Sequence, residues 1–181
     1  MSINEYLKKI ESIPLTGEDL KLANNSNKCE DRSALWNPPE RVPYATDDQL
    51  KDIKNFIKET SINTSKRFTV LDFCCGHGDV IDFIQKTFPT SECYAFDLHA
   101  SHFRAVGDYT NTKIKWYQFP FQNLIFCKEK LYERVDLVVT NNVYGTRHVS
   151  EKLLKGWTAW IEENSRWHIT SHPKKEIKRI V

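Results

Sequence analysis

The feature that most constrains the fold is a short, mostly apolar run, Phe68 to Cys75, that stops at Gly76. A run of this length without regular polar alternation is typical of a strand buried on both faces of a sheet. Both faces of a sheet are covered in this way when helices cross over between parallel strands. The run therefore predicts an α/β fold.

The rest of the chain repeats this pattern, because short apolar runs alternate with stretches in which apolar residues recur at helical spacing. We predict further strands at 93–98, 114–119, 135–140 and 167–171, and helices at 3–12, 46–58, 79–87, 99–106 and from Ser150 onward. Strands that alternate with helices form a mostly parallel sheet with right-handed crossovers and helices on both faces. The expected architecture is Rossmann-like.

The domain organisation follows from length and composition. A chain of 181 residues suits one domain. We predict a helix and loop arm at 1–45 and the main domain at 46–181. Residues 174–181 supply one short strand at most, so the sheet is expected to be minimal or shortened at its carboxyl end. A protein partner that covers the open edge of this sheet is one interpretation of that shortening.

Charge and cysteine content limit the other function classes. The formal net charge of +2 does not favour nucleic acid, although the basic residues Lys174, Lys175, Lys178 and Arg179 leave it open as a partner. No apolar stretch is long enough to cross a membrane. Five cysteines without a C-x-x-C pair predict reduced thiols in a cytoplasmic protein and no metal site.

The loop after the first predicted strand carries the clearest functional signal. Gly76 and Gly78 lack Cβ atoms at the point where the backbone must turn and approach a ligand. An acid, Asp97, ends the second predicted strand 19 residues after Gly78. An acid at about this offset accepts hydrogen bonds from ribose hydroxyls in nucleotide-binding folds. Ile81 occupies the third glycine position of the dinucleotide fingerprint, which argues against a nicotinamide cofactor.

The wider string Val70-Leu-Asp-Phe-Cys-Cys-Gly-His-Gly-Asp79 resembles motif I of class I S-adenosylmethionine (SAM)-dependent methyltransferases, V-L-D-x-G-C-G-x-G. Its Cys-Cys-Gly-x-Gly-Asp part is similar to the quinone-ring methyltransferases. The resemblance extends from about Thr46 to Ser171. It implies a class I methyltransferase fold, SAM as the cofactor and transfer of its methyl group to an acceptor.

The resemblance also implies a role for each matching residue. Asp72 and the loop from Cys74 through Gly76 to Gly78 would hold the methionine end of SAM. Asp97 would hold the ribose and Leu98 would flank the adenine. Phe119 would cover the adenine edge, and Asn141 would face the sulfonium methyl group. Cys74 and Cys75 are interpreted as packing residues rather than nucleophiles.

The segment after the fourth predicted strand, Thr140-Asn-Asn-Val-Tyr-Gly145, resembles an altered N-P-P-Y-G motif of amino-group methyltransferases. Asn141 and Tyr144 match that motif and are the candidate catalytic residues. Asn142 and Val143 replace the prolines that fix its turn. The acceptor is therefore left open, with a lean to a small molecule. The alternative function is a non-catalytic methyltransferase-like subunit or SAM-binding regulatory module.

Overall fold

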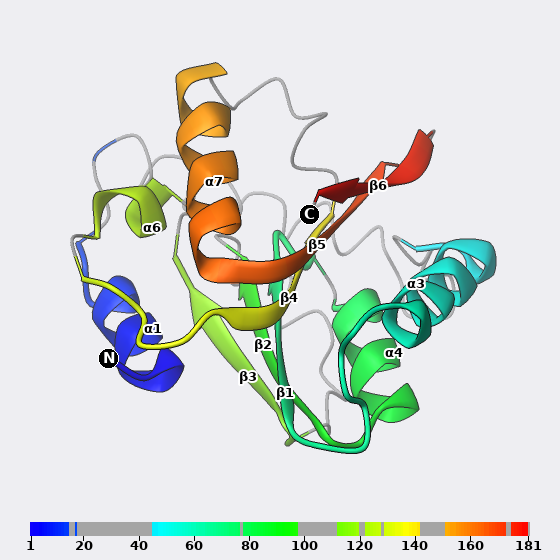
Figure 1. The fold of residues 1–181 in the computed structure, drawn as a ribbon. Helices are drawn as coiled ribbons and strands as arrows, with labels where there is room; N and C mark the ends of the chain where they lie inside the picture. Colours follow the sequence, from blue (N-terminus) through cyan, green and yellow to red (C-terminus); the bar gives the residue numbers. More distant parts are fainter. Residues whose placement is uncertain are drawn as a thin grey trace, which may run out of the picture.

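The computed structural model describes residues 1–14, 17, 45–76, 78–97, 112–119, 122–127, 129–141, 151–172 and 175–180. Its centre is a sheet with strand order β3-β2-β1-β4-β5-β6 (Figure 1). The strands are β1 (Phe68–Phe73), β2 (Ser91–Asp97), β3 (Ile114–Gln118), β4 (Val135–Asn141), β5 (Ser165–His172) and β6 (Lys175–Ile180). The first five pair in parallel, as the sequence predicts, and β6 runs antiparallel to β5.

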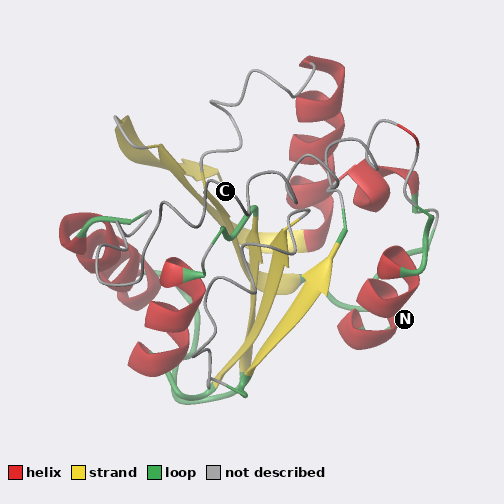
Figure 2. Cartoon of the chain, turned by 180° about the vertical axis from the view of Figure 1, so that it is seen from behind, coloured by secondary structure: helices red, strands yellow, loops and turns green. Residues whose placement is uncertain are grey.

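Helices cover both faces of this sheet, which Figure 2 shows from the opposite side. One face packs against α3 (Asp47–Glu59) and α4 (Asp79–Thr87). The other packs against α1 (Ile3–Glu11), α6 (Gln122–Phe126) and α7 (Glu151–Asn164). Within β1, Val70 belongs to the first core, whereas Leu71 and Phe73 belong to the second. Because side chains alternate along a strand, Asp72 lies on the same face as Val70 and α4.

Two helices begin with a reciprocal cap. The Thr46 hydroxyl accepts from the Gln49 N–H, and the Gln49 side chain accepts from the Thr46 N–H. Ser2 and Glu5 form the same reciprocal pair at α1. Each pair satisfies backbone donors that lack a partner at the start of a helix. The predicted helix at 99–106 lies outside the described residues.

Helix α1 packs into the main core and does not stand apart from it. Tyr6, Leu7 and Ile10 are buried against the sheet. The indole Nε1 of Trp160 on α7 donates to the Tyr6 hydroxyl at 2.9 Å, with the two rings stacked. Trp157 on the same helix is also fully buried. The boundary at residue 45 stays a prediction.

The carboxyl end supplies the one short strand that the sequence allows, β6, as an edge strand beside β5. Among the described helices, none is long and apolar enough to span a membrane. The described residues also contain no cluster of His, Cys, Asp or Glu with the arrangement of a metal site.

Candidate functional site

The candidate site lies where the chain changes direction across the sheet. From β1 it proceeds outward through β2 to β3, then returns to place β4 on the other side of β1. In such sheets, ligands bind beyond the carboxyl ends of the strands at this reversal point. The loop that follows β1, the end of β2 at Asp97 and the end of β4 at Asn141 all lie at this edge.

The loop between β1 and α4 turns through three residues with left-handed backbone angles. Their φ angles are 54° at Cys74, 55° at Gly76 and 76° at Gly78. The Cys75 N–H donates to the Phe96 carbonyl at 3.0 Å, which ties the loop to β2. The Gly78 N–H donates to the Cys75 carbonyl at 2.8 Å, and Gly78 is the N-cap of α4. Glycine adopts these angles without the steric cost that a Cβ atom adds.

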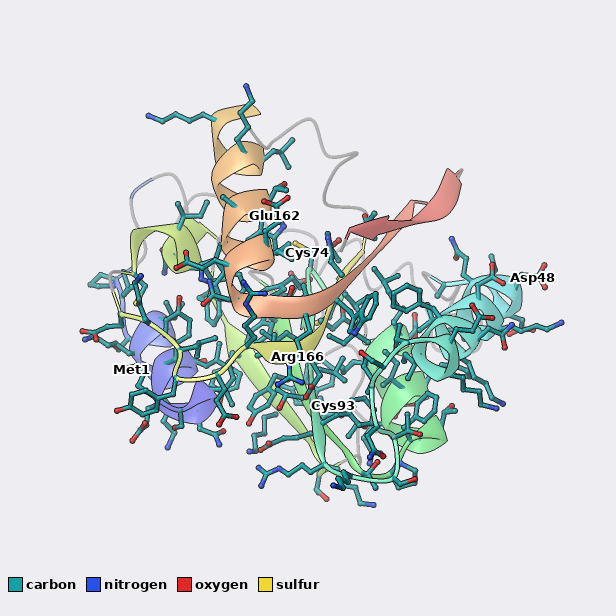
Figure 3. All side chains as sticks on the ribbon, viewed as in Figure 1. Met1, Asp48, Cys74, Cys93, Glu162 and Arg166 are labelled. Atoms are coloured by element: carbon teal, nitrogen blue, oxygen red, sulfur yellow. The ribbon has the colours of Figure 1, made fainter. Side chains whose placement is uncertain are left out.

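Among the described residues, Cys74 is the one non-glycine residue with a left-handed φ angle. It occupies the position at which the methyltransferase motif has its first glycine. Figure 3 labels its side chain at the upper end of the central strands, with Cys93 lower on the sheet. Cys74 as a whole residue is partly exposed although its thiol is buried, whereas Cys75 is buried entirely. The left-handed φ angle at this position therefore explains why the motif has a glycine there.

Asp97 and the glycine loop are brought together, as the sequence predicts. Asp97 is buried to 7% exposure, and its Oδ2 accepts from the Gly76 N–H at 2.9 Å. The carboxylate thus holds the loop against the end of β2. A carboxylate has further lone pairs, so this contact leaves capacity to accept from vicinal hydroxyls.

Asp72 is fully buried, and among the described residues neither of its carboxyl oxygens has a hydrogen-bond partner. Burial raises the pKa of Asp72 well above its usual range, and the charges of Asp97 and Asp79 raise it further. The Ile81 backbone N–H favours the charged form, but it makes no well-aligned hydrogen bond with either oxygen. A buried carboxyl group without partners is costly to fold, so its presence indicates a ligand group that it complements.

The loop thiols do not have the properties of nucleophiles. Burial raises the pKa of Cys75 well above its usual range, and the carboxylates of Asp72 and Asp97 add to the effect. The pKa of Cys74 is raised by burial and by the same two carboxylates. A thiol attacks as its thiolate, which these surroundings disfavour. The interpretation of both cysteines as packing residues agrees with this environment.

The remaining predicted residues divide into three groups. Phe119 follows β3, and its side chain is 2% exposed with its ring centroid 5.2 Å from that of Phe96. Its predicted contact with adenine stays a prediction, because the side chain belongs to the core under α6. Asn141 is the last residue of β4. Leu98 and Tyr144 lie outside the described residues.

Two polar features near this edge were not predicted from the sequence. The Thr140 hydroxyl and His168 Nε2 lie 2.9 Å apart in the core between β4 and β5. Asn123, on α6, is 5% exposed, and its side-chain amide nitrogen has no hydrogen-bond partner within the described part of the chain. The histidine at the second position of the predicted strand at 167–171 was a visible signal for the first pair. No sequence pattern indicated that Asn123 would be buried.

The arrangement fits a ligand that carries both vicinal hydroxyls and positive charge. Asp97 offers acceptor capacity at the end of β2, and Asp72 offers an uncompensated buried carboxyl group at the end of β1. The glycine loop lets a ligand approach the backbone between them.

The comparison with protein families identifies the group to which this site belongs. A family model described as a methyltransferase domain matches residues 28–177. This chain belongs to the methyltransferase domain family. A search of curated protein sequences finds no match to this methyltransferase domain.

Solved structures of other proteins share the fold of this methyltransferase domain. The plantazolicin methyltransferase BpumL, with a triazolic desmethylPZN analog and SAH, is 17% identical with a TM-score of 0.56, covering 93% of this chain and 60% of that chain. Streptomyces venezuelae DesVI is 15% identical, with a TM-score of 0.54, and the match covers 78% of this chain and 56% of the DesVI chain. PKMT2 from Rickettsia typhi, in complex with AdoHcy, is 18% identical, with a TM-score of 0.50, and the match covers 70% of this chain and 25% of the PKMT2 chain. This chain therefore spans 60% or less of the length of these three relatives.

Proposed function

We propose that this chain binds SAM and transfers its sulfonium methyl group to an acceptor. The observation that carries the proposal is the buried Asp72 carboxyl group beside a glycine loop of the methyltransferase type, because its oxygens have no hydrogen-bond partner among the described residues. SAM carries a positively charged sulfur and a ribose with two vicinal hydroxyls. Both groups complement what Asp72 and Asp97 offer.

In this proposal the chain mainly positions the reactants. Bound SAM supplies an electrophilic methyl group, and in-line displacement at that carbon requires alignment more than dedicated acid–base groups. Asp97 accepts from the ribose while it keeps the Gly76 N–H in place. The loop turns close to the ligand because Gly76 and Gly78 have no Cβ atoms. Asn141, at the end of β4, and Tyr144 are proposed to face the acceptor.

We propose a small molecule as the acceptor. The plantazolicin methyltransferase structure contains a desmethylPZN analog, so a related fold accommodates such a ligand. The near-neutral net charge of +2 gives nucleic acid no general electrostatic attraction. A cytoplasmic location is part of the same proposal, supported by the free thiols of Cys74, Cys75, Cys93 and Cys127.

A second candidate function is a SAM-binding module that does not transfer methyl groups. The observation in its favour is the segment after β4, where Asn142 and Val143 replace the two prolines of the amino-group motif. Such a module would act with a protein partner along an edge of the sheet. It would bind SAM without producing S-adenosylhomocysteine (SAH).

The test is calorimetric titration of the purified protein with SAM and with SAH, with Asp97→Ala as the comparison. We expect saturable binding to the wild-type protein that is lost in Asp97→Ala. Incubation with methyl-labelled SAM and a small-molecule extract then separates the two candidates. Label in a small product supports the enzyme, and binding without transfer to small or large acceptors supports the module. A folded protein that binds neither ligand would refute both.

A further inference from the structure

Two neighbouring strands share a buried polar pair near the edge of the sheet that carries the candidate site. The Thr140 hydroxyl on β4 and Nε2 of His168 on β5 lie 2.9 Å apart, and the two residues are 0% and 1% exposed. Thr140 pairs in register with Phe73, the last residue of β1. The pair therefore lies one residue before Asn141, which ends β4 at that edge.

This pair belongs to the face of the sheet that lies opposite Asp72. Val138 packs in the second core, under α1, α6 and α7, and Ile169 packs in the first core. Because side chains alternate along a strand, Thr140 lies on the same face as Val138, and His168 lies on the face opposite Ile169. Both side chains thus lie on the second face, away from Asp72. The pair reaches the candidate site through the backbone of β4.

The stability of the fold does not require a polar pair at this place. Burial lowers the pKa of His168 to about 4, so its ring is neutral at neutral pH. Two neutral polar groups lose their hydration on burial and regain one hydrogen bond, so an apolar pair of similar shape gives comparable stability. A hydrogen bond does supply direction, because it holds its two groups at one distance and angle. Apolar contacts tolerate small shifts.

The sequence after β4 indicates what that direction serves. The amino-group methyltransferase motif has two prolines that fix the turn after this strand, whereas this chain has Asn142 and Val143 there. The pairing of β4 with β5 continues to Asn141, opposite Ser171. Residues other than proline have a freer φ angle, so the direction of the turn depends more on the strand end that precedes it.

We propose that Thr140 and His168 are positioning residues whose hydrogen bond, in place of the two prolines, orients the end of β4 so that Asn141 meets the methyl acceptor. The inference rests on the proposed function, because it assigns a role within the same transfer. Both side chains are in the core, so they act through Asn141 and not on the reactants. A misplacement of about 1 Å slows a displacement by up to about 100-fold.

The experiment separates the rate of transfer from the stability of the fold. Thr140→Val and His168→Leu are combined in one protein, which removes the hydrogen bond and keeps apolar volume. Thr158→Val is the matched control, because the Thr158 hydroxyl donates to the Leu154 carbonyl within α7. Methyl-labelled SAM and one small-molecule extract are the probes. The measurements are label transfer at saturating SAM, SAM affinity by calorimetry and the urea midpoint of unfolding.

We expect the double variant to keep the urea midpoint and the SAM affinity of the wild type and to transfer label at least about ten-fold more slowly. Thr158→Val stays within about three-fold of the wild-type rate. Two single variants distinguish direction from packing. Thr140→Ser keeps the hydroxyl and loses volume, whereas Thr140→Val keeps volume and loses the hydroxyl. We expect Thr140→Ser to transfer label faster than Thr140→Val, the reverse of what a packing role produces.

The outcomes separate the inference from the proposed function. A folded double variant that transfers label within about three-fold of the wild-type rate overturns the inference and leaves the methyltransferase proposal intact. Wild-type protein that binds SAM but transfers no label overturns both the inference and the transfer, and leaves a binding module. Wild-type protein that binds no SAM removes the proposed function itself. If the double variant does not fold, the order of Thr140→Ser and Thr140→Val decides, and faster transfer by Thr140→Val overturns the inference.

Discussion

At the carboxyl end of β1, the Asp72 carboxyl group is buried against α4 without a hydrogen bond, and this burial opposes folding. Its pKa in the folded protein is raised, chiefly by burial and then by Asp97. The stability that Asp72 contributes is therefore greatest below the unfolded pKa of about 3.9 and is lost as the pH rises through the folded pKa.

We accordingly predict that Asp72→Asn stabilises the unliganded protein at neutral pH by roughly 1 to 3 kcal/mol. Urea unfolding of both proteins measures the difference. The gain should shrink as the pH is lowered, because Asp72 then folds with its proton already bound. A variant that is less stable than the wild type at neutral pH would contradict this account of Asp72.

His168 produces the opposite dependence on pH. Burial lowers its pKa from 6.5 to about 4, so the fold holds the neutral ring beside Thr140. Because the unfolded chain binds the proton first, stability is complete above about pH 6.5 and is lost as the pH falls toward 4.

We predict a loss of roughly 3 kcal/mol over that interval, measured as the free energy of unfolding at successive pH values. His168→Gln keeps a polar group for Thr140 and removes the titration, so its stability should vary less between those pH values. The comparison isolates His168 from Asp72, which is present in both proteins. Parallel pH profiles for the two proteins would show that His168 is not the titrating group.

Cys74 tests the backbone geometry of the loop. Its φ of 54° is an angle at which a Cβ atom costs about 1 kcal/mol. We predict that Cys74→Gly stays within about 1 kcal/mol of the wild type, because relief of this strain offsets the greater freedom of glycine in the unfolded chain. Cys74→Val should lose about 1 to 3 kcal/mol, since a β-branched side chain is strained at that angle. Thermal unfolding of both variants measures the contrast, and equal loss in both would argue against a left-handed Cys74.

At the scale of elements, contacts to α7 and to the sheet fix α1. The Trp160 indole donates to the Tyr6 hydroxyl in the core, and Asn4 Oδ1 accepts from Tyr94 Oη at 3.2 Å and from Lys115 Nζ at 3.1 Å. These contacts join the amino-terminal helix to elements about 90 or more residues away in the chain. Helix α1 is therefore a structural part of the sheet layer.

Tyr6→Phe should reduce the free energy of unfolding by about 1 to 2 kcal/mol, because it leaves the buried Trp160 N–H without its acceptor. Tyr132→Phe provides the control, since Tyr132 is 83% exposed and should change stability by less than about 0.5 kcal/mol. Both values come from urea unfolding followed by tryptophan fluorescence. Equal effects of the two substitutions would show that the hydrogen bond between α1 and α7 contributes little.

At the scale of the whole molecule, β6 determines how the sheet ends. It pairs antiparallel with β5 and so occupies hydrogen-bonding groups that β5 would otherwise present at an edge. An exposed strand edge invites pairing with other chains.

We predict that removal of residues 175–181 lowers the thermal stability and causes concentration-dependent self-association. Analytical ultracentrifugation of the shortened and full-length proteins at matched concentrations measures the association. A shortened protein that keeps the hydrodynamic size and unfolding temperature of the full chain would show that β6 is dispensable as an edge.

The sequence by itself determined the order of the five parallel strands, four of the described helices and the position of the cofactor loop, but it did not predict α6. The run at Phe68 predicts a strand buried on both faces, because such a strand lacks polar alternation. The acid at Asp97 was visible because the end of a strand depends on a few neighbouring residues. Gly76 and Asp97 could therefore be assigned to one site from the sequence alone.

Tertiary structure alone decided which of these residues lack partners. The isolation of Asp72, the burial of Asn123 and the contact between Thr140 and His168 depend on how distant elements meet. The place of α1 beside α7 was decided in the same way. Local sequence patterns encode the spacing of apolar residues along a helix or strand and the residues at its ends. The partners of a side chain depend instead on the crossovers that bring separate segments together.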